Sequence, residues 1–185
     1  TRKPTGLLPN QAIMQVEVLS IGGDVSDSEE TLDLTFKSDT IAGMQAWYNA
    51  ANTGSSLANG AVIENWQDSS GYGRDMAFTS GNPRYYNSGL KGKPVVSFDG
   101  DDLMWTNHNF DHLLDTGYTM ISLSRYTGSR NQRVISSRNR NFLFGYEGAL
   151  TGRWFAQGWI STAGPLDTQW HMHLGVIDKR NNPEA

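Results

Sequence analysis

The sequence contains no cysteine, which excludes a disulfide framework, thiol catalysis and a metal site built on thiolates. It also lacks any run of about 20 apolar residues, so no membrane-spanning helix is expected. Charged residues are sparse, at 18% of the chain, and the net charge is −4. This balance gives no electrostatic reason to expect nucleic acid or an anionic membrane as a partner.

Residues that favour turns are abundant instead, and glycine alone occupies 20 positions. Short apolar runs lie between these turn residues, a texture typical of an all-β chain. Asp99-Gly100, placed between two such runs, predicts a β-hairpin. Helix is expected only as a short turn within residues 108–114 or 38–48. The predicted strands cover residues 12–21, 61–66, 94–98, 103–105, 118–126, 133–137, 141–146, 153–160 and 170–177.

Charge is distributed unevenly along the chain. Residues 17–39 contain seven acidic residues against one base, Lys37, whereas residues 116–146 contain five arginines and no acid. We therefore expect residues 1–40 to form an N-terminal arm, part strand and part linker, and residues 41–185 to form the main domain. Three roles for the arm stay open: docking on the domain, pairing with a neighbouring molecule, or connection to a further module.

Five phrases follow one another along the main domain in an order that resembles a known family. They are residues 43–50 (G-M-Q-A-W-Y-N-A), 66–75 (W-Q-D-S-S-G-Y-G-R-D), 92–102 (G-K-P-V-V-S-F-D-G-D-D), 118–122 (Y-T-M-I-S) and 170–173 (W-H-M-H). Together they resemble the laminin-G-like domains of large secreted and surface proteins, which are concanavalin-type jelly rolls. The resemblance spans residues 41–178. It implies an all-β, two-sheet antiparallel jelly-roll sandwich with an N-terminal extension.

The chain departs from this family pattern in two places. The arm has no counterpart in the family, and the strands that close such a sandwich after residues 170–173 are not found before Ala185. An unclosed sandwich exposes strand edges that pair readily with another chain. We therefore expect one of two arrangements. Either the strands that close the sandwich lie outside this sequence, or the chain self-associates through residues 1–40 and the open edge after Ile177.

Two acidic segments offer the oxygen ligands that Ca²⁺ prefers. Residues 68–75 have a carboxylate at each end and glycines that let carbonyls turn inward, and Asp99, Asp101 and Asp102 form a second cluster. The predicted ligands of one structural Ca²⁺ are Asp68, Asp99 and Asp101. The alternative is that both segments are ordinary turns whose side chains cap the backbone.

Paired groups for catalysis are not evident in the sequence. The E-x-D-x-x-E string of sandwich glucanases is absent, and Glu64 is alone on its predicted strand. A polysaccharide lyase needs a tyrosine or histidine base, but nothing in the sequence links the candidates, which are Tyr126, Tyr146, His171 and His173.

The strand predicted over residues 170–177 raises two questions: whether its histidines bind zinc, and which of its faces enters the core. His171 and His173 share one face of it, but a zinc site needs three or four convergent ligands. Strand alternation predicts instead that both histidines face outward and that the other face enters the core. The residues expected in the core are Trp170, Met172, Leu174 and Val176.

Aromatic residues near turns are the expected platforms for sugars, since a ring presents a large, flat apolar face. The favoured candidates are Trp105, Tyr85 and Trp154, from a group that also includes Trp159 and Tyr86.

Arg138 and Arg140 lie in the basic stretch of the chain. We expect them to hold sulfate or carboxylate groups of an acidic polysaccharide, because guanidinium groups match such oxyanions. The alternative is an exposed hairpin that balances the charge of the acidic arm.

These features predict a non-catalytic, lectin-like module for carbohydrate binding or adhesion, located outside the cell, at the cell surface or on a virion. Its expected partner is a glycan or polysaccharide, with no nucleic acid and no membrane insertion. Two alternatives remain open. One is a structural subunit of a virion, fibre or surface filament assembled through the arm. The other is a polysaccharide-degrading enzyme.

Overall fold

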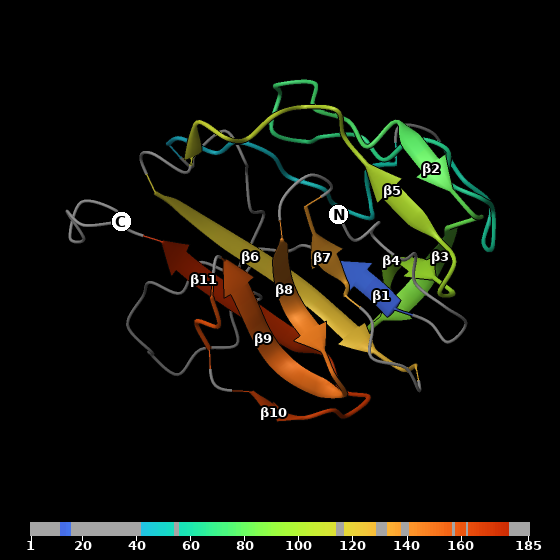
Figure 1. The fold of residues 1–185 in the computed structure, drawn as a ribbon. Coiled ribbons are helices and arrows are strands. Elements are labelled where there is room, and N and C mark those ends of the chain that lie inside the picture. The colour runs from blue at the N-terminus through green and yellow to red at the C-terminus, as the bar shows by residue number, and fades with distance from the viewer. Residues whose placement is uncertain are drawn as a thin grey trace, which may run out of the picture.

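The computed structural model is an antiparallel β structure with almost no helix (Figure 1). It describes the backbone of residues 12–15, and residues 42–53, 56–113, 117–128, 133–137, 141–156, 158–161 and 163–177. The predicted all-β class is confirmed. No helix formed by these residues is long and apolar enough to cross a membrane.

The strands among the described residues form three sheets, in which neighbouring strands are antiparallel. The largest sheet has the order β11-β6-β1-β4-β3 and consists of β1 (Ala12–Gln15), β3 (Arg84–Leu90), β4 (Lys93–Phe98), β6 (Tyr118–Tyr126) and β11 (His171–Ile177). The second has the order β10-β9-β8-β7 and consists of β7 (Ile135–Ser136), β8 (Phe142–Glu147), β9 (Leu150–Ala156) and β10 (Gly164–Pro165). A third, small sheet pairs β2 (Phe78–Ser80) with β5 (Leu103–Trp105).

Strand β1 lies in the middle of the largest sheet, between β4 and β6. Met14 is opposite Val96 on one side and Ser124 on the other. Part of the predicted arm therefore belongs to the sheet of the main domain. The rest of residues 1–40 lies outside the described residues, so the predicted linker stays a prediction.

Two tight hairpins are set by residues with positive φ. Lys91 and Gly92 join β3 to β4 with φ of 45° and 78°, and Gly148 and Ala149 join β8 to β9 with φ of 67° and 54°. Two consecutive positive φ angles define the type I′ turn, whose twist matches that of paired strands. Ala149 takes this conformation without the freedom of glycine.

The hairpin predicted at Asp99-Gly100 is wrong. Strand β5 leaves β4 and pairs with β2, so that Met104 is opposite Thr79. The cause is Asp102, a buried carboxylate that accepts hydrogen bonds from the backbone N–H groups of Asp99 and Asn82. These bonds tie the loop to the segment after β2, and the chain cannot fold straight back along β4.

The core is formed by the inner faces of the two larger sheets and by loop residues that pack against these faces. Tyr146 of β8 is 1% exposed, and its hydroxyl donates a hydrogen bond of 2.9 Å to the carbonyl of Ser124 on β6. Trp66 is fully buried, and its indole donates to the carbonyl of Asn49 at 2.9 Å. The clustered core residues are Ala50, Ile63, Trp66, Val96, Phe98, Met104, Tyr126 and Tyr146.

Strand β11 faces the opposite way from the prediction. His173 and Gly175 are buried, whereas the aliphatic row of Met172, Leu174 and Val176 is exposed by 59%, 61% and 60%. Trp170, expected in the core, is only half-buried, and the guanidinium of Arg125 lies 5.2 Å from its ring centroid.

The reason for this orientation is the facing sheet, which fills the interior with large rings. A methyl group at Gly175 would lie 2.8 Å from atoms of both Phe144 and Trp154. The imidazole of His173 packs edge-on against Tyr146, with ring centroids 5.0 Å apart. The inner face of β11 therefore needs one position without a side chain and one flat ring, and the aliphatic residues take the other face.

We predict that Gly175→Ala destabilises the fold by about 1–3 kcal/mol, because the added methyl group overpacks a filled interior. Urea unfolding followed by tryptophan fluorescence measures the effect. Gly158→Ala is the matched control, since nothing lies within 4 Å of the added methyl group there, and it should shift the free energy of unfolding by less than about 1 kcal/mol. Equal effects of the two substitutions would contradict the packing argument.

Candidate functional site

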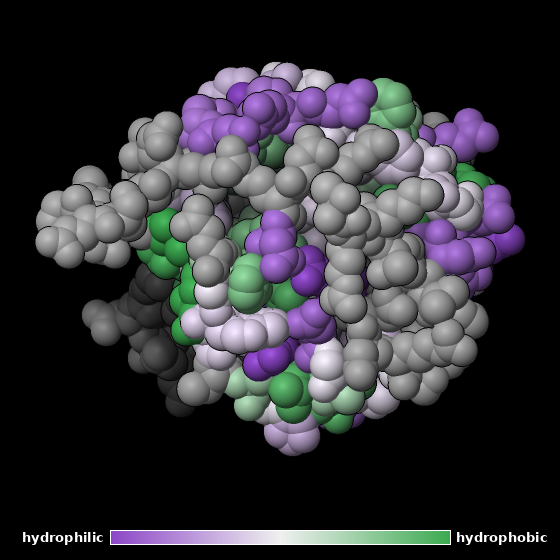
Figure 2. Space-filling view, viewed as in Figure 1, coloured by the Kyte–Doolittle hydropathy of each residue, from purple (hydrophilic) through white to green (hydrophobic). Residues whose placement is uncertain are grey.

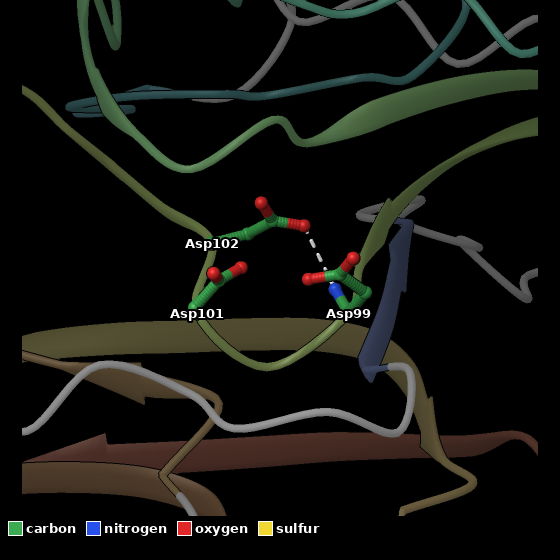
Figure 3. A group of neighbouring side chains, drawn as sticks. All are labelled: Asp99, Asp101 and Asp102. Atoms are coloured by element: carbon green, nitrogen blue, oxygen red, sulfur yellow. Dashed lines mark hydrogen bonds between the residues drawn. The ribbon is translucent and has the colours of Figure 1, made fainter.

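Three carboxylates gather in the loop that joins β4 to β5 (Figure 3). One oxygen from each of Asp99, Asp101 and Asp102 lies within 4.8 Å of the others, and Asp99 and Asp101 are exposed. Two oxygens on opposite sides of a Ca²⁺ ion are about 4.6–5.2 Å apart, given bond lengths of 2.3–2.6 Å. The donor set therefore fits a hard divalent cation.

Asp102 is the buried member of this cluster, at 1% exposure. Burial raises its pKa, and the nearby carboxylates of Asp99 and Asp101 add to the rise, against the lowering effect of its two backbone hydrogen bonds. Gly81 passes directly over it, with φ of +76°, where any side chain would meet the carboxylate. Asp102 thus holds the loop in place while it faces two like charges. A proton or a cation between these carboxylates relieves the repulsion.

Asp68 lies in a different environment from these carboxylates. Its two oxygens accept hydrogen bonds from the backbone N–H groups of Trp47, Ser70 and Arg74, at 2.9, 2.9 and 3.1 Å, and from the Ser70 hydroxyl at 2.6 Å. Burial alone would raise the pKa of Asp68, but these hydrogen bonds outweigh burial and keep the pKa below its ordinary value. The side chain organises the turn around it, in agreement with the alternative reading of residues 68–75.

The metal ligands predicted from the sequence are therefore brought together only in part. Asp99 and Asp101 are neighbours, as predicted, and Asp102 completes the group in place of Asp68. The sequence signal for Asp102 was its position directly after Asp101.

The aromatic residues favoured as sugar platforms lie in three different settings. Tyr85 is half-buried and packs against the core, and Trp105 is half-buried and stacks on Phe78 with ring centroids 5.6 Å apart. Trp154 is 7% exposed, with its ring edge against Phe144. A ring so deeply buried has no free face for a sugar, so the prediction for Trp154 does not fit its position. Arg138 and Arg140 lie outside the described residues.

Trp159, which follows β9, is an exposed indole held by two neighbouring side chains. Its side chain is 50% exposed, the guanidinium of Arg153 lies over the ring at 3.6 Å from the centroid, and Phe155 meets it edge-on at 5.2 Å. A backbone bridge between Phe155 and Trp159 holds the segment against the strand. Trp159 was in the group considered from the sequence but was not favoured. The signal that could have found it is the turn at Gly158, whose carbonyl accepts a hydrogen bond from the N–H of Ala156 at 3.0 Å.

The structure brings together three candidate general bases that the sequence did not connect. The ring of Tyr146 lies 5.0 Å from that of His173 and 6.4 Å from that of His171. Burial raises the pKa of Tyr146 to about 12. Burial, and to a lesser extent the charge of His171, lower the pKa of His173 to about 4. Tyr146 and His173 are parts of the interior, and neither of their pKa values is near the range that general-base catalysis needs.

A surface depression lies elsewhere, lined by Thr53, Leu57, Val62, Glu64 and Asn65. Glu64 is the one acidic residue among these five. Two carboxyl groups about 5–5.5 Å apart are needed for retaining glycoside hydrolysis. The depression does not provide such a pair.

No family model, no curated protein and no solved structure matches this chain. The resemblance to laminin-G-like domains therefore rests on the five sequence phrases alone.

We predict that His173 makes the fold sensitive to acid. Its pKa is about 6.5 when unfolded and about 4 when folded, so its stabilising contribution is complete above pH 6.5. That contribution is lost as the pH falls toward 4, because the unfolded chain takes up the proton first. The expected loss is of the order of 1–3 kcal/mol.

The measurement is urea unfolding between pH 4 and pH 7 for the native chain and for His173→Phe, which keeps a flat ring at this position. The variant should show a smaller slope of unfolding free energy against pH, whatever its absolute stability. Identical slopes would show that His173 does not titrate as its burial implies.

Proposed function

We propose that this chain is a non-catalytic, carbohydrate-binding module with Trp159 as its sugar platform. The observation that carries the proposal is an indole that is half exposed yet fixed in orientation by Arg153 and Phe155. A rigid ring loses little entropy when a ligand stacks on it, and tryptophan and arginine are the residues that most often dominate binding energies. Arg153 adds a positive charge beside the ring, which favours glycans that carry sulfate or carboxylate groups.

The finer fold assignment is part of this proposal. Two antiparallel sheets whose inner faces exchange a hydrogen bond, Tyr146 to Ser124, are compatible with the jelly-roll sandwich that the laminin-G-like phrases imply. The connecting loops of such a sandwich are the expected recognition elements, and Trp159 lies in the segment that follows β9. A location outside the cell or on its surface follows from the same resemblance.

A structural Ca²⁺ at Asp99, Asp101 and Asp102 belongs to the proposal as well. The spacing of the three carboxylates within 4.8 Å supports it, as do the charges of Asp99 and Asp101, which add to the rise that burial causes in the pKa of Asp102. The ion would fasten the loop between β4 and β5, with backbone carbonyls or water completing the six to eight oxygens that Ca²⁺ requires.

The binding prediction is that Trp159→Ala weakens retention on a polysaccharide by about tenfold or more. Affinity electrophoresis in native gels that contain neutral, carboxylated or sulfated polysaccharides measures it. Tyr72→Ala is the matched control, because Tyr72 is also exposed and also carries an arginine over its ring, Arg74 at 4.6 Å. Unchanged retention of Trp159→Ala, or no retention of the native chain on any of the gels, would reject the proposed platform.

The calcium prediction concerns thermal stability. Added Ca²⁺ should raise the unfolding midpoint of the native chain by roughly 5 °C or more near saturation, and a chelator should reverse the shift. Asp101→Asn, an exposed substitution within the cluster, should abolish the shift, whereas Asp111→Asn, an exposed substitution outside it, should not. A midpoint that ignores Ca²⁺ in the native chain would exclude the ion.

A further inference from the structure

Strand β11 presents an apolar row on the outer face of the largest sheet. Met172, Leu174 and Val176 are each about 60% exposed. The row continues onto β6, where Leu123 and Ile121 are the half-buried cross-strand neighbours of Met172 and Leu174. Figure 1 and Figure 2 view the molecule from the side of the smaller sheet, so this outer row is on the face turned away, and only hydrophobic surface at the outline near the end of β11 is in view. Contiguous apolar surface of this kind marks an interaction site more often than isolated exposed residues do.

The same strand is the last in its sheet among the described strands. Natural edge strands are usually protected against pairing by charged residues, proline or a bulge. β11 has the sequence H-M-H-L-G-V-I, with no Asp, Glu, Lys, Arg or Pro, and it pairs with β6 through seven consecutive residues without a register shift. It therefore has a regular edge and an uncharged face, both suited to the addition of another strand.

We propose that a second copy of this chain pairs with β11 in antiparallel fashion, around a two-fold axis at Leu174. A two-fold interface requires a patch that complements itself. Strand β11 is self-complementary when it is paired antiparallel around Leu174. On the outer face, Leu174 meets the partner's Leu174, and Met172 meets the partner's Val176. No like charges are brought together, and the two large sheets join into one continuous sheet.

The inner face fits the same register. His173 is opposite the partner's Gly175, and Gly175 is opposite the partner's His173. Each bulky ring thus meets a position without a side chain, so the pairing adds no overlap on the side already filled by Phe144 and Trp154. The interface uses none of the residues at Trp159 or in the carboxylate cluster, so it stands or falls independently of the proposed carbohydrate binding.

Disulfide trapping provides the sharpest test, because the chain has no cysteine of its own. Directly opposed residues of antiparallel strands have Cα atoms about 4.5–5.5 Å apart, within the range that a disulfide spans. Under mild oxidation, Leu174→Cys should form a dimer that survives denaturing electrophoresis and disappears with reductant. Val62→Cys is the control, since Val62 is an exposed aliphatic residue bridged to Arg84 of β3, at the other edge of the sheet. It should stay monomeric.

Sedimentation velocity of the unmodified chain and of Leu174→Arg completes the experiment. The native chain should sediment as a dimer, and Leu174→Arg as a folded monomer, while Val62→Arg keeps the dimer. Near-ultraviolet circular dichroism checks folding; if Leu174→Arg does not fold, the cysteine result alone decides. A monomeric native chain, a dimer that survives in folded Leu174→Arg, or equal trapping of both cysteines would overturn the proposal. The edge would then be covered by another segment of this chain or by a different protein.

Discussion

The contact of Gly175 with Phe144 and Trp154 is the constraint on which the arrangement of the two large sheets depends. The rings of β8 and β9 reach the backbone of β11 so closely that a single methyl group has no room. Because side chains alternate along a strand, this one position also decides the direction of the others. It places His173 inside, in a setting that lowers the pKa of its imidazole, and it places Met172, Leu174 and Val176 in solvent. The buried histidine and the apolar outer row are two consequences of one close approach.

Two buried or half-buried aspartates have a comparable influence on the loops. Backbone N–H groups that leave a strand need acceptors, and carboxylates supply several at once. Asp68 receives four hydrogen bonds and closes the turn that follows Trp66. Asp102 receives two and diverts the chain from β4 to β2. The difference between them is their surroundings. Asp68 has its oxygens fully engaged by donors, whereas Asp102 faces two exposed carboxylates and so belongs to the group with the chemistry of a cation site.

The surface features divide between the two sheets. Trp159 lies beside β9 in the smaller sheet, with its orientation fixed by Arg153 and Phe155. The aliphatic row lies on β11 in the larger sheet. If Trp159 binds sugars and β11 pairs with a second copy, as proposed, each dimer would present two platforms. Two linked sites bind a repeating polysaccharide more strongly than either site alone, provided that both reach the ligand at once. The adhesive and the structural roles considered from the sequence are therefore compatible with one molecule.

The sequence by itself determined the class of the fold and the position of most strands. Apolar alternation located β4, β5, β6, β8, β9 and β11 to within a few residues, and the acidic phrase at Asp99 and Asp101 indicated a real cluster. It missed β2, β3 and the short β10, and it assigned Asp99-Gly100 to a hairpin that does not exist. The strand predicted over residues 61–66 is also wrong, because this segment makes only isolated bridges at Val62 and Trp66. Alternation states which residues share a face of a strand, but not which face turns inward. On β11, the rings of the opposite sheet decide which face turns inward. The packing of distant segments likewise decides that the indole of Trp154 is buried and that of Trp159 is exposed. Such choices depend on the space left by segments far away in the chain, which only the tertiary structure defines.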